Sequence, residues 1–145
     1  IQILHITGDA HTAAENSPGY VTLPYCDDMA AALSAADLVV SRAGSSTVSE
    51  LAALGFPAVF VPYAVGNVEQ SVNARAAVDA GGALVVSDSQ FTPNWIEHNV
   101  IPLASSSALL EKMSVAMAST GSRRGSELTV NLVEEALASR STPDS

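Results

Sequence analysis

Short apolar runs alternate along this chain with segments in which apolar residues recur at helical spacing. The apolar runs predict strands at Ile1–Ile6, Tyr20–Leu23, Asp37–Val40, Ala58–Val61 and Ala83–Val86. Several of these runs are apolar almost throughout, which is typical of strands covered on both faces. The segments between them predict helices at Met29–Ala35, Val48–Leu54 and Glu69–Ala80. Repeated strand–helix–strand units indicate an α/β, Rossmann-like fold, with a parallel sheet, right-handed crossovers and helices on both faces.

The C-terminal part of the chain continues the helical pattern. Helices that cover or flank the sheet are predicted at Trp95–Leu103, Ala108–Ala118 and Leu128–Ala138. Gly55 and Gly81 follow two of the earlier predicted helices, at positions where a left-handed cap is common. We therefore expect one domain over residues 1–138 and a polar tail over Ser139–Ser145.

The loops after the predicted strands hold the polar residues that could carry chemistry. In an open parallel sheet, ligands bind at the carboxyl ends of the strands. The loops at that edge are Thr7–His11, Pro24–Asp28, Arg42–Thr47 and Pro62–Glu69. Because they meet at one edge, their polar residues predict a single binding site.

The first candidate group lies where a strand passes into a helix. Ser45, Ser46 and Thr47 follow Gly44, which has no Cβ and lets a ligand approach the backbone closely. Free N–H groups and hydroxyls at a helix start suit a phosphate or pyrophosphate. The alternative is that one of these residues only caps the helix. For Glu50 the alternatives are a Thr47-x-x-Glu50 capping box, which spacing alone favours, and a carboxylate that accepts from both ribose hydroxyls.

A second candidate group opens the next predicted helix. Glu69 and Gln70, with Asn73 nearby, place a carboxylate beside an amide, and this pair can accept from and donate to sugar hydroxyls. The alternative is again local, because Asn67-x-x-Gln70 has the spacing of a cap. Two such loops at adjacent strand ends favour a ligand at both.

The remaining chemistry-bearing residues are given structural roles. We expect His5 to be a hydrogen-bonded core histidine and His98 a surface or packing residue, whereas His11 could be either a loop residue or a functional one. Asp27 and Asp28 precede a predicted helix and suit capping and the helix dipole. No Ser/His/Asp order indicates a catalytic triad.

Composition and charge exclude several classes of partner. The chain has 145 residues and a net charge of −9, which argues against nucleic acid and against this surface lying flat on an anionic membrane. Cys26 is the single cysteine, so no internal disulfide forms, and no metal-ligand spacing is present. We expect neither a metal nor a cofactor.

No apolar run approaches the ~20 residues of a membrane span. Since the chain opens inside a predicted strand, we expect it to be a piece of a longer protein.

One continuous block carries a resemblance to a known family. Ser41–Glu50 with the following residues up to Tyr63 resembles the C-terminal domain of the MurG family, the lipid-linked N-acetylglucosaminyltransferases of peptidoglycan synthesis in glycosyltransferase family 28. Tyr25–Met29 and His5-x-x-Gly8 resemble other blocks of that domain in the same order. The resemblance covers residues 1–138 and is weakest between Phe91 and Ser126.

The resemblance implies a role for each candidate residue. The fold would be the C-terminal half of a two-domain GT-B enzyme that holds UDP-N-acetylglucosamine. Thr47 would meet the phosphates, Ser45 and Ser46 would supply backbone donors, and Glu50 would hold the ribose. The Cys26 backbone would pair with uracil, with Met29 nearby, while Glu69 and Gln70 would meet the sugar hydroxyls.

The resemblance also implies what lies outside the chain. The family transfers N-acetylglucosamine to lipid I with inversion, giving lipid II, at the cytoplasmic face of the bacterial plasma membrane. The family's N-terminal domain, which would carry the acceptor site, the catalytic base and the membrane contact, is absent from this sequence, as are the first strand and Gly-rich loop of the C-terminal half. We therefore expect the isolated chain to be inactive.

One departure from the family leaves other functions open. Many family members have Gln-Gln where this chain has Glu69-Gln70, so the sugar contacts differ in at least one group. The alternatives are another GT-B glycosyltransferase with a soluble or glycolipid acceptor, or a non-catalytic nucleotide-sugar-binding module with the same fold.

Overall fold

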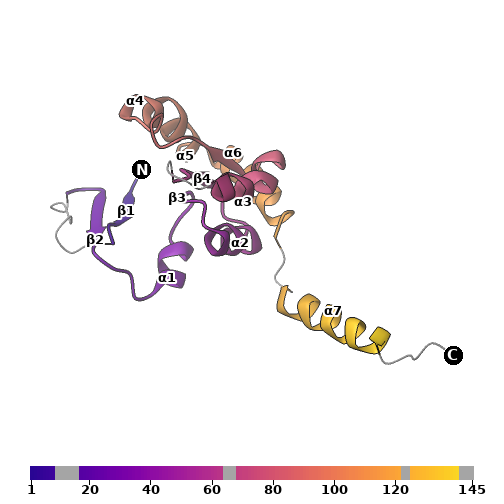
Figure 1. Cartoon of the computed structure of the whole chain (residues 1–145). Coiled ribbons are helices and arrows are strands. Elements are labelled where there is room, and N and C mark those ends of the chain that lie inside the picture. Colours follow the sequence, from indigo (N-terminus) through magenta and orange to yellow (C-terminus); the bar gives the residue numbers. More distant parts are fainter. Residues whose placement is uncertain (9–16, 64–67, 122–124, 141–145) are drawn as a thin grey trace.

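The structure, a computed structural model, confirms the alternation of strands and helices (Figure 1). It describes residues 1–8, 17–63, 68–121 and 125–140. The strands are β1 (Ile3–Ile6), β2 (Tyr20–Leu23), β3 (Val39–Ser41), β4 (Ala58–Phe60) and β5 (Ala83–Val85). The helices of the first half are α1 (Met29–Ser34), α2 (Ser45–Leu54) and α3 (Val68–Asp79). Those of the second half are α4 (Pro93–Trp95), the π-helix η1 (Ile96–Val100), α5 (Ile101–Ala104), α6 (Ser107–Ala118) and α7 (Gly125–Arg140).

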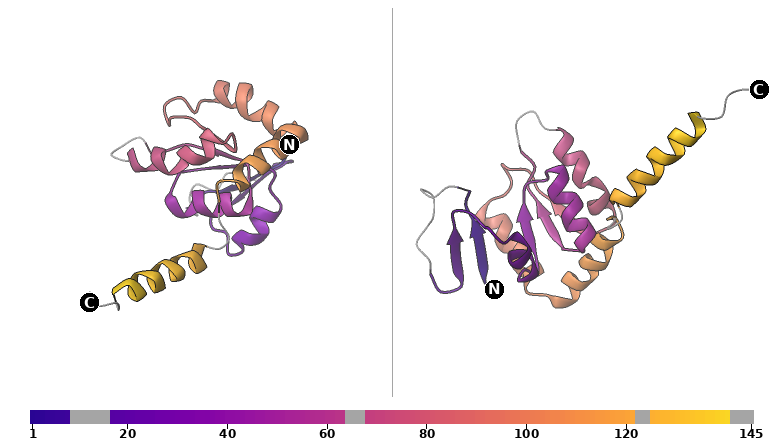
Figure 2. Two further views of the ribbon diagram at one scale, coloured as in Figure 1. Left: turned by 90° about the vertical axis from the view of Figure 1, so that its right-hand side faces the viewer. Right: turned by 90° about the horizontal axis from the view of Figure 1, so that it is seen from below.

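All strand pairs of the named sheets are parallel, as the crossovers predict, but the strands form two sheets. β3, β4 and β5 make a three-stranded sheet with β4 in the middle, and β1 pairs with β2 separately. In Figure 1 and in the right-hand view of Figure 2, β1 rather than β2 lies on the side of the small sheet that faces β3. The edges of β1 and β3 that face each other are therefore not joined by a strand of the described chain.

The core lies on both faces of the three-stranded sheet because successive residues of β4 point to opposite sides. Ala58 and Phe60 pack against α2, α3 and the end of α6, in a cluster that includes Leu51 and Met117. Val59 packs on the other face with residues from the α5 and α6 side of the sheet. Helices thus cover both faces of this sheet, as predicted, and β4 is fully buried.

β1 differs from the sequence-based expectation. Its run of apolar residues predicts a strand covered on both faces, yet Ile3 is 49% exposed and Leu4 is 45% exposed. Val40 on the facing edge of the other sheet is 45% exposed as well. The prediction of coverage is therefore wrong for β1 within this chain, because no described segment packs over it.

Two helices begin or continue differently from the prediction. α2 starts at Ser45, three residues before the predicted Val48, because its N-cap is Gly44. The predicted helix Trp95–Leu103 is instead α4, η1 and α5 in succession, with Pro102 in the first turn of α5. Proline has no N–H to donate, and a local π-helix is one way for a helix to accommodate such a break.

The last helix, α7, extends away from the sheets in both figures and runs past its predicted end to Arg140. Val130, Leu132 and Val133 on this helix are more than half exposed. Residues 141–145 of the predicted tail lie outside the described residues. No helix of the described chain is long and apolar enough to span a membrane.

Candidate binding site at the carboxyl edge of the sheet

The loop after β3 passes directly into α2 with no side-chain cap. Gly44 is the N-cap in an extended conformation (φ −64°, ψ 146°), and only its carbonyl oxygen is engaged, by the N–H of Val48 at 2.9 Å. Ser45, Ser46 and Thr47 are therefore the first three helical residues rather than caps. The capping-box interpretation of Thr47 and Glu50 is wrong, because the helix begins before Thr47.

This start leaves the first turn of α2 available to a ligand. The first N–H groups of a helix have no acceptor within the helix, and here no side chain of the described residues supplies one. The same groups carry the positive end of the helix dipole, which favours an anion. The geometry therefore suits a phosphate group beside Ser45, Ser46 and Thr47.

Glu50 lies one turn further along α2, on the same helix face as Thr47. Its side chain is exposed, and within the described residues it has neither a hydrogen bond nor an ion pair. A carboxylate in that state can accept two hydroxyl hydrogen bonds from a ligand.

The start of α3 is fixed to the loops after β3 and β4. Oε1 of Gln70 accepts the backbone N–H of Tyr63 at 3.0 Å, and Nδ2 of Asn73 donates to the carbonyl oxygen of Ala43 at 3.2 Å. The side chain of Gln70 thus contacts the loop after β4. Asn67, its predicted capping partner, lies outside the described residues. Glu69 is exposed in the first turn of α3, so the structure brings Glu69 and Gln70 to the same edge as the α2 start.

Cys26 and Met29 lie after β2, in the other sheet. Cys26 is a half-buried free thiol, and Met29 is 43% exposed at the start of α1. Oδ1 of Asp28 accepts the N–H of Ala31 at 2.9 Å, which confirms Asp28 as the helix cap. No hydrogen bond within the described chain joins Cys26 or Met29 to α2, and the small sheet that leads to them is not paired with the sheet that leads to α2.

Arg42 makes contacts that the sequence analysis missed. Its Nη1 donates to Oδ1 of Asp88 at 2.5 Å and to the carbonyl oxygen of Val61 at 3.1 Å. Its guanidinium lies 4.8 Å from the centre of the Tyr63 ring. Arg42 follows β3, Tyr63 follows β4 and Asp88 follows β5, so one side chain connects three strand ends. The only sequence signal for it is a lone Arg two residues before Gly44.

His5 and His98 take no part in the contacts described at this edge. Nδ1 of His5 and the hydroxyl of Tyr20 are hydrogen-bonded at 2.7 Å, but His5 is exposed, so its predicted core location is wrong: β1 has no covering layer. His98 is exposed, as predicted, with Nδ1 2.8 Å from the carbonyl oxygen of Asn94. His11 lies outside the described residues. Among the residues that are described, no group of three side chains could hold a metal ion.

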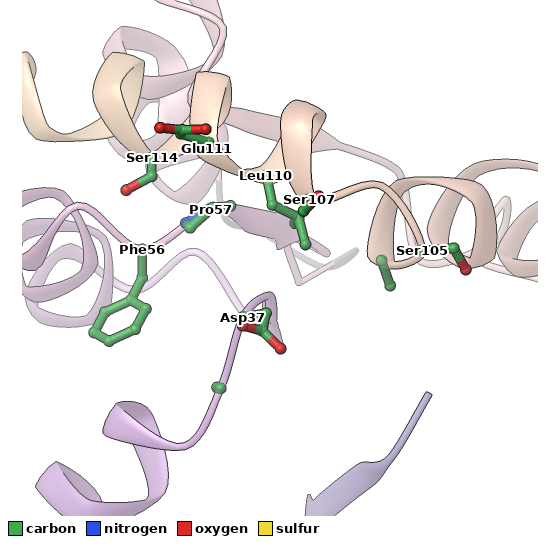
Figure 3. Close-up of a pocket in the computed structure, with 10 residues that line it drawn as sticks. Asp37, Phe56, Pro57, Ser105, Ser107, Leu110, Glu111 and Ser114 are labelled. Carbon is green, nitrogen blue, oxygen red and sulfur yellow. The ribbon is translucent and has the colours of Figure 1, made fainter.

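A pocket of about 490 Å³ lies at the opposite edge of the sheet. Figure 3 shows Asp37 and Phe56, which precede β3 and β4, across from Glu111 and Ser114 on α6. Because ligands of open parallel sheets bind at the carboxyl ends of the strands, this pocket is separate from the candidate site.

Comparison with known proteins gives a consistent result. The family model "Glycosyltransferase family 28 C-terminal domain" matches residues 1–129. The chain is 52% identical over 142 residues to a UDP-N-acetylglucosamine–N-acetylmuramyl-(pentapeptide) pyrophosphoryl-undecaprenol N-acetylglucosamine transferase of Clavibacter sepedonicus, covering 96% of this chain and 38% of that protein. A transferase of the same name from Streptomyces avermitilis is 42% identical over 145 residues, covering 97% of this chain and 40% of that protein.

Solved structures give the same fold. The crystal structure of Acinetobacter baumannii MurG superposes with a TM-score of 0.74 at 33% identity, over 80% of this chain and 35% of that chain. A calicheamicin glycosyltransferase superposes with a TM-score of 0.63 at 24% identity, over 93% of this chain and 33% of that chain, which is a likeness of fold alone. The chain spans well under half the length of the curated relatives it matches.

Proposed function

Because this chain belongs to glycosyltransferase family 28, as a C-terminal domain, we propose that it is the donor-binding part of an inverting N-acetylglucosaminyltransferase. The donor is UDP-N-acetylglucosamine, and the acceptor is lipid I, undecaprenyl-pyrophosphoryl-N-acetylmuramoyl-pentapeptide; the product is lipid II. The names of the relatives from Clavibacter and Streptomyces support both substrates. The observation that carries the proposal is the start of α2, which no side chain caps, with the Glu50 carboxylate one turn away and without a partner among the described residues.

Each set of residues at the carboxyl edge of the sheets binds one part of the donor. The N–H groups of Ser45, Ser46 and Thr47 bind the diphosphate, and Glu50 accepts from the ribose hydroxyls. Glu69 and Gln70 meet the hydroxyls of N-acetylglucosamine. The Cys26 backbone pairs with the uracil edge, with Met29 beside it, when the two sheets are brought together as described below.

The chemistry is a direct displacement at the anomeric carbon. The acceptor hydroxyl oxygen forms a bond to that carbon while the bond to the β-phosphate oxygen breaks, so the configuration inverts. The bonding electrons leave with UDP, and the acceptor proton passes to a base in the N-terminal domain. N–H donors at the start of α2 stabilise the negative charge that grows on the diphosphate as the bond breaks.

The two separate sheets support a longer protein. We propose that a strand and a Gly-rich loop from the segment before Ile1 insert between β1 and β3 and join both sheets into one. The half-exposed apolar residues Ile3, Leu4 and Val40 on and beside these edges would then be covered. The N-terminal domain would supply the acceptor site and a peripheral contact with the cytoplasmic face of the plasma membrane.

A donor-selectivity assay tests the proposed function. The full-length protein is incubated with lipid I and with UDP-N-acetylglucosamine, UDP-glucose or UDP-galactose, and the lipid product is resolved by mass. We expect N-acetylglucosamine transfer to exceed the other two reactions by at least about tenfold, since a lost hydrogen bond to a built site is worth about that factor. No transfer from UDP-N-acetylglucosamine would overturn the proposal.

A further inference from the structure

Arg42 links three strand ends at the carboxyl edge of the β3–β4–β5 sheet. Its Nη1 donates to Oδ1 of Asp88, beyond β5, and to the carbonyl oxygen of Val61, beyond β4. Pro62, the next residue, has its carbonyl oxygen 3.5 Å from the same nitrogen. All three contacts use the same nitrogen, so what a lysine would lose here is the planar guanidinium that lies over the Tyr63 ring.

The same guanidinium also fixes Tyr63. It lies over the Tyr63 ring at 4.8 Å from the centroid, within the range of a cation–π interaction. Tyr63 is 57% exposed, so little else holds its side chain in place. The contacts to Val61 and to Tyr63 lie on both sides of Pro62, and together they set the path of the chain after β4.

The path of that chain sets the orientation of Gln70. The backbone N–H of Tyr63 can only donate, so the group of Gln70 that faces it is the oxygen, Oε1, at 3.0 Å. The amide nitrogen of Gln70 then faces away from Tyr63 and keeps its two N–H donors. Glu69 beside it carries a carboxylate that can only accept.

We propose that Arg42 is a positioning residue of the donor site: held by Asp88, it fixes the Tyr63 backbone, so that Gln70 presents amide donors to the transferred sugar. This inference rests on the proposed function. It divides the two residues at the start of α3 into an acceptor, Glu69, and a donor, Gln70. Arg42 itself touches neither the diphosphate nor the sugar, and its charge is paired with Asp88.

The test compares two ligands that differ only in the sugar. Binding of UDP and of UDP-N-acetylglucosamine to the full-length protein is measured by calorimetry for wild type, Arg42→Lys and Asp88→Asn. We expect both variants to bind UDP-N-acetylglucosamine about fivefold more weakly, which corresponds to the ~1 kcal/mol of a half-exposed ion pair with its neighbours, and to bind UDP as wild type does.

The controls use the other ion pair of the described residues. Arg75 and Asp79 on α3 are 3.9 Å apart and largely exposed. Arg75→Lys and Asp79→Asn make the same chemical changes, and we expect neither to alter the ratio of the two affinities. Melting temperatures are recorded for every variant. If Arg42→Lys does not fold, Asp88→Asn still tests the proposal, because it leaves Arg42 in place.

The other possible results contradict the positioning role of Arg42 or the proposed function. If Asp88→Asn tightens UDP binding, Arg42 is a direct phosphate ligand that Asp88 partly neutralises, and the positioning role is wrong. Equal losses for UDP and UDP-N-acetylglucosamine, or no loss for either, would also overturn it. If wild type binds UDP and transfers a sugar while the variants behave as wild type, only this inference fails. If wild type binds neither UDP nor UDP-N-acetylglucosamine, both the proposed function and the inference about Arg42 are wrong.

Discussion

Nδ2 of Asn73 on α3 donates a hydrogen bond to the carbonyl oxygen of Ala43, 30 positions earlier, in the loop that leads into α2. Ala43 is completely buried, so its carbonyl oxygen has no access to water and requires a partner inside the protein. The contact holds the two helix starts of the candidate site at one separation. A ligand that touches both α2 and α3 therefore meets a preformed edge.

Removal of this contact should cost both stability and donor affinity. Asn73→Ala leaves a buried carbonyl oxygen without a donor, and we expect the free energy of unfolding to fall by about 1–2 kcal/mol. Asn73→Asp should be worse, because a carboxylate cannot donate and faces another oxygen. Urea denaturation of the full-length protein checks the order. Equal stability of wild type and both variants would show that the hydrogen bond contributes nothing.

Glu50→Gln separates binding from folding. Since Glu50 has no partner among the described residues and takes no part in a cap, the substitution should leave the melting temperature unchanged. Glutamine keeps the shape but loses the charge-assisted hydrogen bonds to the ribose diol, so we expect UDP-N-acetylglucosamine to bind about tenfold more weakly.

The matched control for Glu50 is Glu111→Gln on α6, at the opposite edge of the sheet. It removes the same charge from an exposed helix position, and donor affinity should stay as in wild type. Calorimetry with UDP-N-acetylglucosamine measures both variants. If Glu50→Gln lowers the melting temperature as much as it lowers the affinity, Glu50 stabilises the fold and does not bind the ribose.

Gln70→Glu tests the assignment of donor and acceptor at the start of α3. Glutamate still accepts the Tyr63 N–H through a carboxylate oxygen, so the loop should keep its path. It offers no N–H to the sugar, however, and places a second negative charge beside Glu69. We expect a several-fold higher KM for UDP-N-acetylglucosamine with little change in melting temperature. Steady-state kinetics of the full-length protein measures this; an unchanged KM would contradict the donor role of Gln70.

The parts of the fold that depend on local pattern were predictable. Continuous apolar runs found β4, and an Asp before a helix identified the Asp28 cap. The start of α2 was not predictable, because Ser45, Ser46 and Thr47 are all good caps by residue type. The N-cap is Gly44, whose backbone is extended, and no local sequence pattern predicts this conformation.

Contacts between distant residues were beyond the sequence analysis. Arg42 and Asp88 are 46 positions apart, and nothing near either residue signals the other. The exposure of β1 is a different case, since its apolar pattern fits a central strand and the described chain does not cover it. The inserted strand that we propose would supply that cover.

The isolated chain should not perform the reaction. Because we propose that the acceptor site and the base lie in the N-terminal domain, we expect no detectable lipid product from residues 1–145 in the presence of UDP-N-acetylglucosamine and lipid I. UDP-N-acetylglucosamine itself should bind weakly, because the sheet that leads to Cys26 and Met29 is not paired with the sheet that leads to α2. Product formation by the isolated chain would contradict this division of roles between the two domains.

Gly82 gives a last prediction, on packing between α6 and the start of β5. A Cβ on Gly82 would lie 2.5 Å from both the backbone nitrogen and the Cα of Met117, whose side chain is completely buried in the core. Backbone atoms of a packed helix cannot move aside cheaply, so Gly82→Ala must push α6 away from the sheet. We expect the free energy of unfolding to fall by about 1–3 kcal/mol, the usual cost of overpacking. Gly125→Ala is the control, because a Cβ there meets no atom within 4 Å. Thermal denaturation of the full-length protein compares them, and equal melting temperatures would mean that α6 is not packed against Gly82 as described.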